Sequence, residues 1–220
     1  RSDCTLRVPS TSLTTPQRTQ VEGREIPIEH DPAVWHVTLE LAPPTMAAGG
    51  RDEDLRDDET RVLDALREQH HIEVDRIDID VLRQLSVQLR EEDWHVGVAG
   101  RDGEIIRVAS PTCPLLGIAV DLGTTKIAGY LMDLESGRTL AARGMMNPQI
   151  AYGEDVVARA TRAQRSPEER RRFQELIASA FNRLASDLCA ESGNRPEQIV
   201  EAVIVGNTAM HHLYLRLPVG

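Results

Sequence analysis

The chain has 220 residues, enough for one large domain or two modest ones. Its formal net charge is −10, with 35 Asp and Glu residues against 25 Lys and Arg residues, which argues against a binder of nucleic acid or of an anionic membrane surface. The sequence contains no apolar stretch long enough for a membrane-spanning helix, and its start has no signal-peptide pattern. Three cysteines, Cys4, Cys113 and Cys189, share no metal-binding spacing, and we expect inert thiols in a cytoplasmic protein.

The first residue is Arg1 rather than Met, and the last residues, up to Gly220, form no obvious terminal element. We therefore expect a piece of a longer protein. Residues 1–32 are polar and rich in Thr, Ser and Pro, so they are expected to form a linker or a loosely attached leading segment.

Residues 33–110 predict a small α+β domain. Apolar and polar residues alternate over 34–41, as in a strand with one wet face. Two amphipathic helices are expected next, one around Val62 to Leu66 after an acidic start and one over 78–92. A strand pair around a turn at 100–103 completes a β-α-α-β-β order. None of these residues is placed like a catalytic set.

Two prolines within 109–114 mark a boundary, and residues 113–220 predict a second, α/β unit. Its expected elements in chain order are strands at 115–120, 127–134 and 138–146, a helix toward Gln164, a helix at 166–193, a strand at 202–205 and a helix from about Ala209. The 166–193 helix begins with Ser, Pro and Glu in cap positions, and its Phe173, Leu176, Phe181 and Leu184 are expected to pack on the sheet that contains Val120.

The turn after the first strand of this unit has the chemistry of a phosphate site. Asp121 closes the apolar run, and Gly123, Thr124, Thr125 and Lys126 supply backbone N–H groups, two hydroxyls and an ammonium. A carboxylate at a strand end also suits a hydrated Mg²⁺ ion bound beside phosphate. The alternative is a plain hairpin turn. Lys126 is the chain's only lysine, which indicates either a specific contact or chance placement.

Two further segments carry candidate site residues. Gly206, Asn207 and Thr208 lie between a strand and a helix, where backbone N–H groups can face an anion or where the turn can be a bare cap. Asp155 precedes a helix and is either a cleft residue or the cap of that helix.

The turn at 121–125 resembles the first phosphate loop of the actin, Hsp70 and sugar-kinase superfamily, in which it joins two strands of a ribonuclease-H-like fold. Together with the Asn147-Pro148-Gln149 and Tyr152–Arg159 segments and with Val205–His212, it resembles the ATPase-type domain of reductive activators of corrinoid proteins. Residues 33–110 are similar to the middle domain of that family. The resemblance covers nearly the whole chain and implies an α/β fold with a small α+β leading domain, followed by a ribonuclease-H-like lobe with a mixed sheet.

The resemblance implies that ATP and Mg²⁺ act in the parent protein and that a [2Fe-2S] domain passes an electron to a Co(II) corrinoid on a methyl-transfer partner. Asp121 would help to hold Mg²⁺, Gly123, Thr124 and Thr125 would bind phosphate, and Asn207 would approach the nucleotide. The resemblance also implies an electron donor and allows a homodimer. The four cysteines of a [2Fe-2S] site and the second phosphate loop are absent from the sequence, so we expect little turnover from this chain alone.

Two other functions fit parts of the sequence. The same lobe could belong to a sugar- or acid-kinase-like phosphotransferase, which would need a second lobe with a substrate-binding base. The small leading domain could instead dock a partner in a non-catalytic interaction module. Clustered cysteines before this chain and a second Asp-x-Gly loop after it would favour the corrinoid activator.

Overall fold

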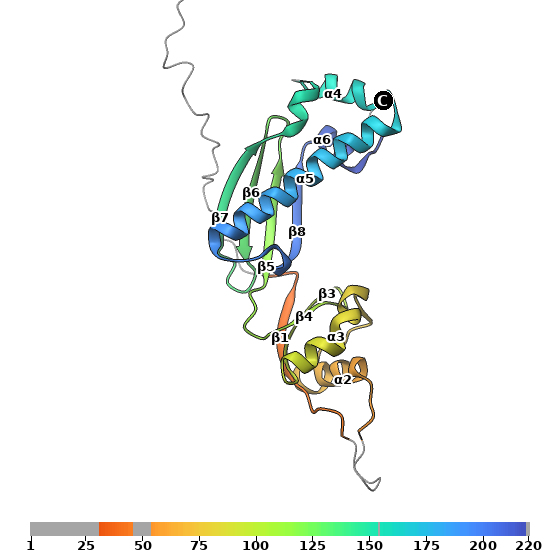
Figure 1. Cartoon of the computed structure of the whole chain (residues 1–220), viewed down its shortest axis with the longest axis vertical. Helices are drawn as coiled ribbons and strands as arrows, with labels where there is room; N and C mark the ends of the chain where they lie inside the picture. The colour runs from red at the N-terminus through yellow and green to blue at the C-terminus, as the bar shows by residue number, and fades with distance from the viewer. Residues whose placement is uncertain (1–30, 46–53, 154, 219–220) are drawn as a thin grey trace, which may run out of the picture.

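The computed structural model describes residues 31–45, 54–153 and 155–218 (Figure 1). Apart from its last two residues, the linker expected over 1–32 lies outside the described part. The described chain contains two four-stranded sheets, each of which combines antiparallel and parallel strand pairs. This mixed α/β architecture confirms the predicted fold class.

The leading unit is built on a sheet of order β1-β3-β4-β2. Its strands are β1 (Trp35–Glu40), β2 (Arg76–Ile77), β3 (His95–Arg101) and β4 (Glu104–Ala109), and its helices are α2 (Asp58–His70) and α3 (Ile79–Glu91). Both helices begin at a capping aspartate, Asp57 or Asp78, whose side chain accepts hydrogen bonds from first-turn N–H groups. Apolar residues of the helices and strands form one buried core, which includes Leu39, Leu66 and Leu89.

Two details of the leading unit differ from the prediction. The β3–β4 turn consists of Asp102 and Gly103 alone, both at positive φ, so Gly100 and Arg101 still belong to β3. The two-residue strand β2 was not expected, and it pairs parallel with β4. Such a short strand has no alternation from which it could be recognised.

The second unit, which we call the lobe, has a sheet of order β7-β6-β5-β8. Its elements are β5 (Leu116–Leu122), β6 (Lys126–Asp133), β7 (Thr139–Met146), η1 (Pro148–Tyr152), α4 (Val156–Ala163), α5 (Pro167–Ser192), η2 (Pro196–Gln198), β8 (Ile199–Gly206) and α6 (Thr208–Leu215). Helix α5 lies across one face of this sheet (Figure 1).

Helix α5 has the ends that the sequence predicted. The side chain of Ser166 accepts a hydrogen bond from the Glu169 N–H, and Gly193 ends the helix in the left-handed region with a φ of 73°. Of the four residues expected to face the sheet, Phe173 and Leu184 are fully buried in the core, and Phe181 is half-buried against it. Leu176 is half-buried and lies outside this core, whose middle is filled instead by Ile177 and Ala180.

No helix in the described ranges is both long and apolar enough to cross a bilayer.

The two units meet at the start of β5 and β8. Arg107 on β4 donates hydrogen bonds to the carbonyl oxygens of Pro114 and Gln198, at 3.0 and 3.1 Å. Arg101 forms an ion pair with Glu201 of β8. A small apolar cluster that includes Val34, Ala99 and Leu115 is buried at the same junction. Polar and apolar contacts thus join the leading unit to the lobe.

Candidate functional site

Asp121 lies one residue before the end of β5. In the strand register it pairs with Ala128 on β6 and with Val205 on β8. Because side chains alternate between the faces of a sheet, Asp121 lies on the face opposite to buried Val120 and Leu122. Asp121 is exposed. The carboxylate is therefore presented at the carboxyl end of β5, on the face away from α5.

The turn after β5 contains Gly123, Thr124 and Thr125, and β6 begins at Lys126. Lys126 is therefore the first residue of a strand, where the sequence reading placed it with the loop. A Cβ atom on Gly123 would lie 2.5 Å from the carbonyl oxygen of Lys126, so the turn closes too tightly for a side chain at this position.

The carbonyl oxygens of the turn are held by the interior of the lobe. Gly123 O accepts from Asn147 Nδ2 at 2.8 Å, and Thr124 O accepts from Arg159 Nη1 at 2.6 Å. Thr125 O accepts from the backbone N–H of Asn147 at 2.9 Å. In a trans peptide the N–H points opposite to the preceding C=O. The N–H groups of Thr124 and Thr125 therefore point away from Asn147 and Arg159.

The polar side chains around this turn have no protein partner in the described part of the chain. Neither the Asp121 carboxylate, nor the hydroxyls of Thr124 and Thr125, nor the Lys126 ammonium makes a hydrogen bond or an ion pair with another described residue. An arrangement with backbone carbonyls held behind and free N–H, hydroxyl and ammonium donors in front suits an anion.

The end of β8 lies beside the end of β5. Gly206 is the last residue of β8 and pairs with Leu122, and a Cβ atom on Gly206 would lie 2.9 Å from the Leu122 carbonyl oxygen. Asn207 caps α6, because its Oδ1 accepts from the Met210 N–H at 3.0 Å. Thr208 is the first residue of that helix and is exposed. The cap occupies the side-chain oxygen of Asn207. The N-terminus of α6 lies at the same end of the sheet as the turn.

Asp155 is the N-cap of α4, and its Oδ1 accepts from the Ala158 N–H at 2.6 Å. The predicted site residue thus has a structural role at the start of this helix. Four residues later, Arg159 is fully buried and donates from Nε to Gly153 O at 2.8 Å, besides its bond to Thr124 O. Helix α4 therefore begins directly behind the phosphate-type turn.

Burial lowers the pKa of the Arg159 guanidinium, and the negative charge of Asp155 opposes that shift. The group nevertheless stays cationic, because arginine is not deprotonated in proteins. A positive charge is thereby fixed behind the turn. Sequence reasoning quoted Asn147 and Arg159 only as parts of a motif and gave them no role, because neither residue type by itself indicates burial.

The donor set fits Mg²⁺ bound through phosphate better than a cation held by the protein alone. Among the described residues, no group of three His, Cys, Asp or Glu side chains is placed to hold a metal ion. Asp121 would thus be the only carboxylate ligand from the turn, and Mg²⁺ usually takes one or two carboxylates with phosphate and water.

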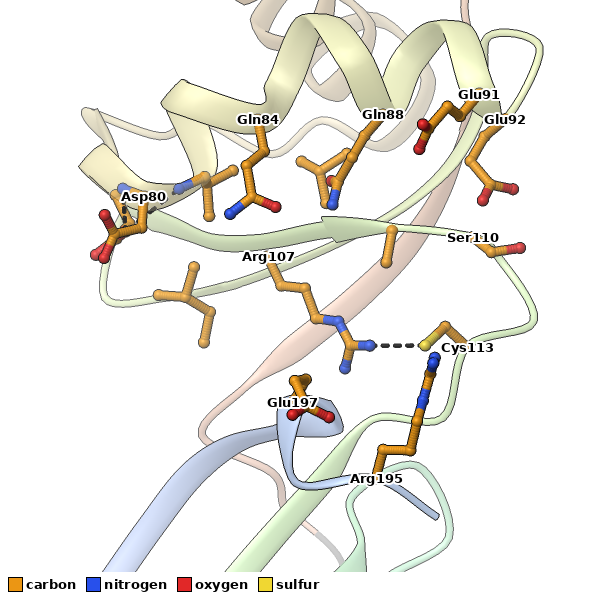
Figure 2. A pocket seen from close by; sticks show the side chains of 15 residues that line it. Asp80, Gln84, Gln88, Glu91, Glu92, Arg107, Ser110, Cys113, Arg195 and Glu197 are labelled. Atoms are coloured by element: carbon orange, nitrogen blue, oxygen red, sulfur yellow. Dashed lines mark hydrogen bonds between the residues drawn. The ribbon is translucent and has the colours of Figure 1, made fainter. Parts of the chain in front are cut away.

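A separate polar groove of about 510 Å³ lies between α3 and β4 of the leading unit and the start of the lobe (Figure 2). Arg107 points from β4 toward Cys113, and its Nη2 donates to the sulfur at 2.7 Å. Gln84 and Gln88 line the helix side, and Glu197 lies on the lobe side. The groove lies at the junction of the units, whereas the phosphate-type turn lies at the other end of β5.

Two models of the reductive activator family match the chain. The model described as RACo linker region matches residues 23–112, and the model described as RACo middle region matches residues 116–220. Under these descriptions the leading unit is the linker region and the lobe is the middle region, whereas the sequence resemblance placed the middle domain at residues 33–110. Together the two matches cover most of the chain.

Two relatives agree with these matches. The "Corrinoid activation enzyme RamQ" of Eubacterium limosum is 36% identical over 159 residues, which are 70% of this chain and 27% of RamQ. A solved "Reductive activator for corrinoid,iron-sulfur protein" matches with a TM-score of 0.69 and 31% identity, over 88% of this chain and 31% of its own. The chain thus spans less than a third of either relative. Its fold, its two matched regions and these identities show that the chain belongs to the family of reductive activators of corrinoid proteins.

Proposed function

We propose that residues 113–220 are the first lobe of an ATP-dependent ATPase-type domain, and that residues 33–110 are a distinct leading domain joined to it. The observation that carries the proposal is the turn at 123–125. Its carbonyl oxygens are bound from behind by Asn147 and Arg159, while Asp121 and both threonine hydroxyls have no partner among the described residues. That combination suits a phosphate group with a bound cation.

In this proposal the substrate of the parent protein is a Co(II) corrinoid on a methyl-transfer partner, which is returned to Co(I). A [2Fe-2S] centre outside this chain supplies the electron, and a separate electron donor reduces that centre. Nucleotide binding can drive such a step only through a difference in affinity between two protein states. We place the protein in the cytoplasm, and a homodimer is compatible with the proposal. The support comes from the family membership and from the names of its two relatives.

Each candidate residue has a proposed part. Asp121 would hold Mg²⁺ through its free carboxylate, and Gly123, Thr124 and Thr125 would bind phosphate through N–H and hydroxyl groups. Lys126 would add an ammonium from the start of β6.

On the neighbouring strand, Gly206 lets the two strand ends approach closely, and the start of α6 at Asn207 and Thr208 would face the nucleotide. Asp155 would act on the site indirectly, by fixing the start of α4, from which Arg159 reaches the turn.

The test is Asp121→Asn in the full-length protein that contains this chain. The amide keeps the shape and removes the charge, so folding should be preserved. Mg-ATP affinity should fall about tenfold or more, since the loss of even an outer partner of a metal ligand typically costs that much. Calorimetry measures the affinity, and absorbance follows Co(I) formation with the partner and an electron donor.

Asp102→Asn is the matched control, because Asp102 is exposed in a hairpin turn of the leading unit and accommodates Asn at positive φ. It should leave nucleotide affinity unchanged. In the isolated 220-residue chain, Asp121→Asn should change almost nothing. Wild-type affinity and reduction rate in the full-length Asp121→Asn variant would refute the phosphate-site proposal.

A further inference from the structure

We propose that Asn147 and Arg159 are positioning residues that hold the phosphate turn in its binding conformation. This inference rests on the proposed function of the turn. Neither residue is expected to touch the nucleotide, because both are at most 1% exposed and lie behind the turn. They act through the carbonyl oxygens of Gly123, Thr124 and Thr125.

Asn147 binds the turn from two of its own groups. Its side-chain Nδ2 donates to Gly123 O and its backbone N–H donates to Thr125 O. Its Oδ1 meanwhile accepts from the Gln149 N–H at 2.9 Å, at the start of η1. The amide orientation is thereby fixed, because Oδ1 needs a donor on one side and Nδ2 needs an acceptor on the other. An aspartate at position 147 would still accept the hydrogen bond from the Gln149 N–H. When ionised, it could not donate to Gly123 O and would repel that oxygen.

Arg159 binds the carbonyl group between the two that Asn147 binds. Its Nη1 donates to Thr124 O and its Nε to Gly153 O, so one rigid guanidinium ties the turn to the segment before α4. Nη1 also lies 4.0 Å from Met210 Sδ on α6. Arg159 therefore contacts the turn, the start of α4 and α6, and these carry the three sequence segments that together mark the family.

Fixing three successive carbonyl groups fixes three peptide planes. The N–H groups of Thr124 and Thr125 are turned outward by this arrangement, and neither donates to another described residue. Preorganised N–H groups bind an anion without first losing conformational entropy. The buried guanidinium adds a positive charge behind the same peptides. Loss of either positioning residue should thus weaken binding of the phosphates and spare the binding of a nucleoside.

The experiment compares Arg159→Met, Arg159→Lys and the control Arg162→Met in the full-length protein. Arg162 lies one turn further along α4, pairs with Glu169 at 2.8 Å and packs over the Tyr152 ring, so it has no contact with the turn. Methionine approximates the length of arginine without its donors. Calorimetry gives the affinities for Mg-ATP and for adenosine, and thermal unfolding checks that each variant is folded.

We expect Arg159→Met to weaken Mg-ATP binding about tenfold or more and to leave adenosine binding within about twofold of wild type. Arg159→Lys should fall between, because one ammonium cannot span both carbonyl groups. Arg162→Met should match wild type for both ligands. Equal affinities of Arg159→Met and Arg162→Met for Mg-ATP would overturn the proposal, and so would an equal loss of Mg-ATP and adenosine binding in Arg159→Met.

Asn147→Asp supplies a second, pH-dependent readout. An ionised carboxylate cannot donate to Gly123 O, whereas a protonated carboxyl group can. Burial raises the pKa of a carboxyl group, so the introduced aspartate should gain its proton before the protein unfolds in acid. Mg-ATP affinity relative to wild type at the same pH should therefore be low at high pH and should recover toward wild type as the pH is lowered. A ratio that does not change with pH would contradict the role of Asn147, since a purely structural defect has no reason to recover on protonation.

Hydrogen exchange separates a failure of this inference from a failure of the proposed function. Peptides that cover 121–127 should exchange faster in Arg159→Met than in Arg162→Met, with no nucleotide present. Faster exchange with unchanged Mg-ATP binding would retain the positioning role and refute the phosphate site. Unchanged exchange would refute the positioning role even if wild type binds Mg-ATP.

Discussion

The two faces of the lobe sheet differ sharply along a single strand. On β5, Val120 and Leu122 are buried on the face of the sheet that α5 covers. Asp121, between them, is exposed on the opposite face. On β8, Ile204 packs against the core, while Val203 and Val205 remain more than half exposed. Successive residues of one strand are thus alternately buried in the core and exposed. The face under α5 stabilises the fold, and the other face carries the exposed Asp121 carboxylate.

Because of this division, substitutions on the two faces should separate stability from binding. Changes under α5 should lower the free energy of unfolding, and changes on the other face should leave it nearly constant. The following variants of the 220-residue chain test that separation.

The largest effect is expected for Leu184→Ala. Leu184 is 1% exposed in the core between α5 and the sheet. Loss of its buried methyl groups should cost about 2–5 kcal/mol of unfolding free energy, measured by urea denaturation. Leu140→Ala is the matched control, because Leu140 on β7 is 38% exposed and should cost much less. A change within about 0.5 kcal/mol for Leu184→Ala would show that α5 does not cover the sheet.

Gly129→Ala should show the same packing from the opposite side. A Cβ atom on Gly129 would lie 2.5 Å from Leu184 Cδ2 and 3.3 Å from Leu188 Cδ1. Overpacking of this kind costs about 1–3 kcal/mol. In the Gly129→Ala and Leu184→Ala double variant the clash is removed, so the combined loss should be smaller than the sum of the two. If the loss in the double variant equals the sum of the two single losses, the alanine at position 129 does not contact Leu184.

A smaller effect is expected at the contact between α4 and α5. The hydrogen bond from Arg162 lowers the pKa of Glu169, so the pair stabilises the folded state above the ordinary glutamate pKa. This stabilisation is lost as the pH falls through the lowered pKa. Wild type should therefore exceed Glu169→Gln in unfolding midpoint at pH 7, and the difference should shrink as the pH falls below the ordinary glutamate pKa. A difference that grows with acidity would have the wrong sign for this pair.

The smallest effect should come from the exposed face. Val203 is 54% exposed, so Val203→Ala should change the unfolding free energy by no more than about 0.5 kcal/mol. Val120→Ala is its counterpart on the neighbouring strand, where the valine is 3% exposed, and it should cost clearly more. Equal losses of unfolding free energy in the two variants would show that the two faces of the sheet do not differ in their contribution to stability.

The elements that the sequence predicted well are those with strong local signals. Ser166 and Gly193 bound α5 because a hydroxyl cap and a left-handed glycine end a helix through local bonds alone. The short strand β2 was missed, since two residues carry no period and depend on pairing with β4. Leu176 was assigned to the core because helical spacing gives a face but not its width.

The front of the candidate site was predictable, and its support was not. Asp121, Gly123 and the threonines form one contiguous motif whose chemistry can be read in order. Asn147 and Arg159 are 24 and 35 residues from the carbonyl groups that they bind, and arginine on a helix is usually solvated. Their burial depends on tertiary packing. The assignments of individual site residues remain predictions that the Asp121→Asn and Arg159→Met experiments test.

The placement of the unit junction at the start of β5 and β8 has a mechanical consequence. The phosphate turn lies at the other end of β5, which at seven residues is about 23 Å long. The turn at 123–125 and the leading unit therefore lie at opposite ends of β5 and β8 (Figure 1). In the function proposed above, a tilt of these strands on phosphate binding would be passed to the leading unit, because Arg107 and Arg101 attach that unit to the lobe at the start of β5 and β8.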